Sequence, residues 1–143
     1  MGLATPLTPP PFEALVLHDG RKVRIGRPLG RGSMATVYRG VIEGTYGMHR
    51  PVAVKLFGIV ATDDQESALG AIARAAQRMA CVRHPNVAQV YELGITEVQP
   101  YIASELVDGM SLRQLLDAYS ARGRKLPLDL ALFIALEIAE GLC

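Results

Sequence analysis

The chain has 143 residues, of which 50% are hydrophobic and 20% charged, so it is long enough for one domain with an apolar core and too apolar to be disordered. Its formal net charge of +1 gives no reason to expect a nucleic-acid partner or an acidic surface. The two cysteines, Cys81 and Cys143, are too few for a disulfide framework, and no apolar run is long enough for a membrane span. Because the N-terminus also lacks a signal-peptide pattern, a soluble cytoplasmic protein is expected.

The N-terminal part of the chain is predicted to be a leader followed by three strands. Prolines at positions 6, 9, 10 and 11 and a turn signal at residues 18–21 indicate a flexible leader over residues 1–20. Residues 23–29, 36–43 and 51–57 are rich in β-branched and apolar residues and predict an antiparallel meander.

The remainder is predicted to contain three helices and two more strands. Thr62 and Gln65 have the spacing of a capping box, and apolar residues then recur at helical intervals as far as residue 81. Pro85 ends this helix, because the residue before a proline avoids the helical conformation. Strands at residues 87–95 and 101–107 and helices at residues 111–121 and 128–143 follow. The expected fold class is α+β, with a five-stranded antiparallel sheet, one inserted helix and two further helices.

A glycine-rich turn and a lysine carry the first functional signal. Gly30 and Gly32 lie between the first two predicted strands, where glycines allow close approach of a ligand and exposed N–H groups can bind phosphate oxygens. Lys55 lies in the middle of an apolar strand, where a cation is costly without an anionic partner. A nucleotide phosphate held by the glycine turn would supply that partner.

The glycine turn also fits two other interpretations. Gly30-x-Gly32-x-x-Ala35 also fits the dinucleotide-binding fingerprint, which should open a helix and be followed about 20 residues later by an acid. Strand-forming residues follow here instead, and residues 48–52 contain no acid, which argues against a dinucleotide site. A hairpin turn without a ligand would explain the glycines alone but not Lys55.

Several motifs resemble those of the eukaryotic-type (Hanks-type) Ser/Thr protein kinases, especially the bacterial branch. The first two are Gly30-x-Gly32-x-x-Ala35-x-Val37 and Val52-Ala53-Val54-Lys55. Later blocks follow in the family's order: His84-Pro85-Asn86-Val87, residues 101–112 and residues 136–142. The resemblance covers roughly residues 24–143. It implies a kinase small lobe over residues 21–107 and the first helices of a truncated large lobe over residues 108–143.

The resemblance also implies an ATP site. Lys55 would pair with the α- and β-phosphates, and the glycine loop would close over them. Val37 and Ala53 would sandwich the adenine ring, and Ser104 would be a small gatekeeper residue. Residues 105–107 would form the hinge, whose backbone groups bind the adenine edge. The implied ATP-contacting residues are Leu29, Gly30, Arg31, Gly32, Ser33, Val37, Ala53, Lys55, Ser104, Glu105 and Val107.

Two positions depart from the family pattern in the small lobe. Ala35 replaces the third glycine of the loop, which predicts only a modest loss of phosphate contact. The helix glutamate that pairs with the lysine is expected about nine residues before His84, where Ala75 stands and no neighbour is acidic. Glu66 lies nine residues earlier, about 13 Å along the helix axis, so Lys55 is expected to lack its usual partner. His84 itself is expected to be structural.

A third departure concerns catalysis. The catalytic-loop His-Arg-Asp and the metal-binding Asp-Phe-Gly do not occur in the 143 residues, so no catalytic residue and no magnesium ligand is assigned. The chain alone is therefore not expected to transfer phosphate, although a complete parent kinase would use ATP and magnesium on a protein substrate. The alternative is a pseudokinase-like module that binds nucleotide or protein without catalysis.

Overall fold

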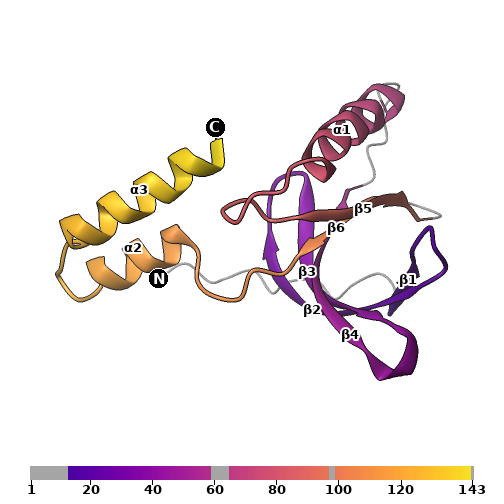
Figure 1. Ribbon diagram of the computed structural model, residues 1–143, viewed down its shortest axis with the longest axis horizontal. Coiled ribbons are helices and arrows are strands. Elements are labelled where there is room, and N and C mark those ends of the chain that lie inside the picture. The colour runs from indigo at the N-terminus through magenta and orange to yellow at the C-terminus, as the bar shows by residue number, and fades with distance from the viewer. Residues whose placement is uncertain (1–12, 59–64, 97–98, 143) are drawn as a thin grey trace. The chain divides into compact units, whose positions relative to one another are not determined.

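The computed structural model describes residues 13–58, 65–96 and 99–142 of the chain (Figure 1). These residues form two compact units: the first contains the strands and α1, and the second contains residues 84–88 with α2 and α3. The elements are β1 (Ala14–Val16), β2 (Lys22–Arg31), β3 (Ala35–Glu43), a short 3-10 turn (Thr45–Gly47), β4 (His49–Phe57), α1 (Gln65–Ala80), β5 (Val90–Ile95), β6 (Pro100–Glu105), α2 (Leu112–Ser120) and α3 (Leu128–Leu142).

The first unit is built on one antiparallel sheet with the strand order β1-β2-β3-β4-β6-β5. The predicted α+β class is confirmed, but the described sheet has six strands where five were predicted. The additional strand is β1, which lies inside the range predicted to be a flexible leader. That prediction is wrong for β1 because Leu15 and Leu17 are buried in the core and Leu15 pairs with Val23. Residues 1–12, with all four of the early prolines, lie outside the described residues.

The core of the first unit lies on one face of the sheet. Side chains alternate between the faces of a strand, so Tyr38 and Val54 face the core while their neighbours Val37 and Lys55 face the other way. Gly40 lies in the middle of this core, where a Cβ would come within 3.2 Å of the side chains of three valines. The core residues are Leu15, Leu17, Val23, Ile25, Tyr38, Ile42, Val52, Val54, Leu56, Tyr101 and Ala103.

A hydrogen-bonded cluster of Tyr101, Glu92 and His18 joins the two edges of the sheet. The Tyr101 hydroxyl donates to Glu92 Oε1 at 2.7 Å, and the same oxygen accepts the backbone N–H of His18 at 2.9 Å. His18 follows β1 at one edge, whereas Glu92 lies in β5 at the other, so the sheet curls until its edges meet. Burial, and then the hydrogen bond to Glu92, raise the pKa of Tyr101.

Helix α1 packs against β5 through a narrow face. Ala76 is buried, whereas Ala75 is exposed. The predicted helix is confirmed from Gln65 onward, while its capping residue Thr62 lies outside the described residues.

In the second unit, a capping box begins α2. Ser111 Oγ accepts the backbone N–H of Gln114 at 3.2 Å, and the Ser111 N–H donates to Gln114 Oε1 at 2.8 Å. The turn at residues 84–88 packs against α3, because the Asn86 side chain donates to the Glu137 carbonyl at 2.9 Å. Within the described parts of the chain, no helix is long and apolar enough to cross a membrane.

Candidate functional site

The register of the sheet brings the predicted phosphate-binding residues into one row. Val37 of β3 lies opposite Gly30 of β2 on one side and opposite Lys55 of β4 on the other. Directly opposed side chains on antiparallel strands lie about 5 Å apart at their Cβ atoms. The lysine and the end of the glycine loop are therefore neighbours across a single strand, although they are far apart in sequence.

A second row contains the predicted adenine-binding residues. Ala53 lies opposite Arg39 on β3 and opposite Ser104 on β6. Ala53 and Lys55 are two residues apart on one strand, so both rows lie on the same face of the sheet. We call this the ligand face, defined by Val37, Arg39, Ala53, Lys55 and Ser104. Arg39 was not among the predicted site residues, although its place two residues after Val37 puts it on the same face.

The glycine loop forms a tight turn between β2 and β3. The Gly32 N–H donates to the Ala35 carbonyl at 2.8 Å, and the Gly58 N–H donates to the Met34 carbonyl at 3.0 Å. Neither Gly30 nor Gly32 has a positive φ. A Cβ on Gly30 would meet nothing within 4 Å, so the missing side chain leaves open space beside the loop backbone. The backbone conformation itself does not require glycine at this position. Leu29, Arg31 and Ser33 of the same loop are exposed.

Lys55 is exposed on the ligand face, which corrects the argument that its burial in an apolar strand demands an anionic partner. The apolar neighbours Val54 and Leu56 face the core, while the lysine Nζ lies 5.0 Å from the centroid of the Phe57 ring. Ion pairs within the described residues join Arg21 to Asp19 and Arg24 to Glu43, and neither involves Lys55. Within the described part of the chain, its ammonium group therefore has no carboxylate partner.

At the predicted hinge, Glu105 is bonded to Gln89, which precedes β5. The Glu105 N–H donates to the Gln89 carbonyl at 2.8 Å, and the Gln89 N–H donates to Glu105 Oε2 at 3.1 Å. Ser104, the predicted gatekeeper, is half-buried. Val107 is exposed and belongs to the second unit, so it is not among the residues that the sheet brings together.

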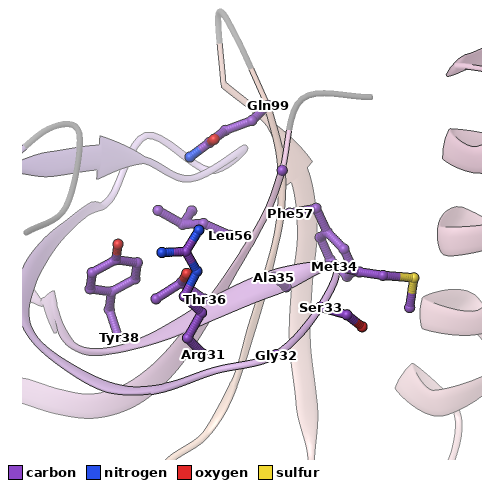
Figure 2. Close-up of a pocket in the computed structure, with 11 residues that line it drawn as sticks. Arg31, Gly32, Ser33, Met34, Ala35, Thr36, Tyr38, Leu56, Phe57 and Gln99 are labelled. Atoms are coloured by element: carbon purple, nitrogen blue, oxygen red, sulfur yellow. The ribbon is translucent and has the colours of Figure 1, made fainter. Parts of the chain in front are cut away.

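A pocket of about 340 Å³ lies on the other side of the glycine loop (Figure 2). It shares Arg31, Gly32 and Ser33 with the predicted site. However, Thr36 and Leu56, which also line it, belong to the face opposite Val37 and Lys55. Figure 2 shows the Arg31 side chain on the same side of the sheet as Thr36 and Leu56. Ala35 and Phe57, which also line it, lie on the same face as Val37 and Lys55, but none of the five residues that define the ligand face lines this pocket.

The turn at residues 84–87 contains the predicted structural histidine. His84 Nδ1 accepts the Asn86 N–H at 3.1 Å, and the Val87 N–H donates to the His84 carbonyl at 3.1 Å. A Cβ on Gly141 of α3 would lie 3.3 Å from the Asn86 Cβ, so the turn and the helix are closely packed. The His84 imidazole therefore stabilises the turn that contains it.

Comparison with known proteins agrees with these motifs. A family model described as protein tyrosine and serine/threonine kinase matches residues 23–143. The probable serine/threonine-protein kinase PknB of Lactococcus lactis is 36% identical over 121 residues, which cover 85% of this chain and 18% of that kinase. A probable serine/threonine-protein kinase of Streptomyces coelicolor is 36% identical over 128 residues, with 86% and 18% covered. Serine/threonine-protein kinase PrkC of Bacillus subtilis is 32% identical over 97 residues, with 68% and 14% covered.

The chain thus spans less than a fifth of the length of these curated relatives. The family match, however, covers β2 from Val23 onward, the described strands β3 to β6 and all three described helices. The motifs and the relatives agree on the same branch of the family. The chain therefore belongs to the protein tyrosine and serine/threonine kinase family and is one of its bacterial, Hanks-type serine/threonine members.

Proposed function

We propose that this chain is the N-terminal, ATP-binding part of a Ser/Thr protein kinase, which in complete form transfers phosphate from ATP to Ser or Thr side chains of a protein. The observation that carries the proposal is the ligand face, on which Val37, Ala53, Lys55 and Ser104 meet in two adjacent rows. These positions come from three strands. A shared face with an exposed ammonium group, which no described carboxylate pairs, is what an anionic nucleotide requires.

Different residues of the proposed site would bind different parts of ATP. Lys55 would attract the phosphates, and the open space at Gly30 would let the loop backbone approach them. Val37 and Ala53 would contact the adenine ring with apolar surface, while the backbone at Glu105 would bind its polar edge. Arg39 lies beside Ala53 and would contribute a second positive charge near the nucleotide.

The chain itself is proposed to bind ATP without transferring phosphate. No His-Arg-Asp or Asp-Phe-Gly segment occurs in the 143 residues, so nothing here would orient a substrate hydroxyl or hold magnesium. The proposed partners are therefore ATP and, for the complete kinase, magnesium and a protein substrate, in the cytoplasm. Binding of ATP by the chain alone would depend little on magnesium.

A titration of the purified chain with ATP tests the proposal. Saturable binding is expected, and Lys55→Met should weaken it about tenfold, since a charge-assisted contact to phosphate is lost. Lys22→Met is the matched control, because Lys22 is also an exposed lysine on a strand but lies at the β1 edge of the sheet. The proposal would be contradicted by an absence of binding, or by equal effects of the two substitutions.

A pseudokinase-like module is the second candidate function. The observations that favour it are the alanine at position 75, which is exposed on α1, and the lack of a carboxylate beside Lys55 among the described residues. Ala75→Glu separates the two candidates. Tighter ATP binding by this variant would mean that a working site lacks only its acid, whereas unchanged binding favours a module that does not use the lysine–glutamate pair.

A further inference from the structure

The Glu105 side chain replaces a backbone acceptor at the point where the sheet ends. In a regular antiparallel pair, two hydrogen-bonded residues exchange both of their N–H···O=C bonds. Gln89 and Glu105 make only one of them, from the Glu105 N–H to the Gln89 carbonyl at 2.8 Å. The Gln89 N–H turns instead to the Glu105 carboxylate, at 3.1 Å from Oε2.

The consequence is that the Glu105 backbone carbonyl is left without its ladder partner. Among the described residues, the donor that reaches this carbonyl is the Ser104 hydroxyl, at 3.5 Å, which is the outer limit of a hydrogen bond. A carbonyl that has lost its strand partner at a sheet end is a strong acceptor for a ligand.

The position of Gln89 is itself held by its side chain. Its Nε2 donates to the Val90 carbonyl at 3.1 Å and lies 3.4 Å from the Ala80 carbonyl at the end of α1. A register shift between Val90 and Glu92 follows immediately in β5. The bulge and the amide contacts together keep the Gln89 N–H aimed at the carboxylate.

We propose that Glu105 is a positioning residue, whose carboxylate takes the Gln89 N–H so that its own carbonyl remains free to accept a hydrogen bond from the 6-amino group of adenine. This inference rests on the proposed ATP-binding function and assigns to the side chain a role in nucleobase selection. Without the carboxylate, the Gln89 N–H closes the regular ladder onto the Glu105 carbonyl and competes with the adenine amino group for that acceptor.

Nucleobase discrimination tests the role of the carboxylate. Glu105→Met should weaken ATP binding about fivefold, the value of one hydrogen bond, and leave binding of inorganic tripolyphosphate and of inosine triphosphate, which lacks the 6-amino group, unchanged. Glu105→Gln keeps an acceptor oxygen and should restore ATP binding. Glu43→Met is the control, because it removes a half-buried glutamate, ion-paired with Arg24, from the same sheet away from the predicted hinge.

A ligand-free measurement separates this inference from the proposed function. NMR couplings across hydrogen bonds should connect the Gln89 amide nitrogen to the side-chain carboxyl carbon of Glu105 in the unsubstituted chain, and to the Glu105 backbone carbonyl carbon in Glu105→Met. A coupling to the backbone carbonyl before substitution would overturn the inference, whatever the chain binds. Failure of all nucleotides to bind, with the couplings as expected, would overturn the ATP-binding function and the nucleobase role together. Equal weakening of ATP, inosine triphosphate and tripolyphosphate binding by Glu105→Met would overturn only the nucleobase role.

Discussion

Val37 and Lys55 face each other directly across β3 and β4, while the next pair in register, Tyr38 and Val54, lies on the opposite, buried face of the same strands. One residue of displacement therefore separates the face proposed to contact ATP from the face that packs in the core. Because of this alternation, substitutions at neighbouring positions should affect either ATP binding or stability.

Substitution of Ala53 should affect ATP binding, whereas substitution of Val54 should affect stability. Ala53→Leu adds bulk to the ligand face and is expected to abolish ATP binding while changing the free energy of unfolding by less than about 0.5 kcal/mol. Val54→Ala, at a fully buried side chain, should cost about 2 kcal/mol of stability. Its ATP affinity, corrected for the folded fraction, should not change. Denaturant unfolding and ATP titration of both variants measure this, and the reverse pattern would show that the faces are assigned wrongly.

Gly40 should be intolerant of even one methyl group. A Cβ there would lie 2.9 Å from Val54 Cγ2 and 3.0 Å from Val23 Cγ1, so Gly40→Ala is expected to cost about 1–3 kcal/mol by overpacking. Gly30→Ala is the matched control in the same sheet, because its Cβ would meet nothing within 4 Å. Similar unfolding midpoints for the two variants in a urea titration would contradict the packing described around Gly40.

The Tyr101–Glu92 hydrogen bond should make stability fall at high pH. Burial and Glu92 raise the pKa of Tyr101 above its ordinary value of 10.0, so the folded state holds the phenolic proton more tightly than the unfolded state does. Its contribution is complete below pH 10 and is lost as the pH rises beyond it. Tyr101→Phe should cost about 1 kcal/mol at pH 8. The difference between the two proteins should shrink above pH 10; a constant difference in unfolding free energy would count against this.

Much of the sheet was predictable because apolar and β-branched residues recur with a period of two. The strand β1 was missed because its three residues follow a proline-rich segment, although the alternation of Leu15 and Leu17 was a usable signal. The error about Lys55 had a physical cause. An apolar sequence suggests that both faces of β4 are buried, whereas β4 joins the core cluster through the face that carries Val54 and Leu56, and Lys55 on the other face is exposed.

The contacts at the hinge could not be read from the sequence. The exchange between Gln89 and Glu105 depends on the register shift in β5, which no spacing of residue types indicates. The pocket beside Arg31 likewise combines residues from the loop, from β4 and from the segment before β6. Sequence motifs indicated four of the five residues of the ligand face, all except Arg39, because those four belong to short, ordered blocks.

The most direct test of the account is an NMR titration of the chain with ATP, followed through the backbone amides. The largest shift changes are expected at Gly30, Val37, Ala53 and Lys55 and at Glu105 of the predicted hinge. The core-facing residues Val54 and Leu56 should change less than their neighbours. Shift changes confined to Thr36, Leu56 and Gln99, around the pocket beside Arg31, would place the nucleotide away from the ligand face and contradict the central claim.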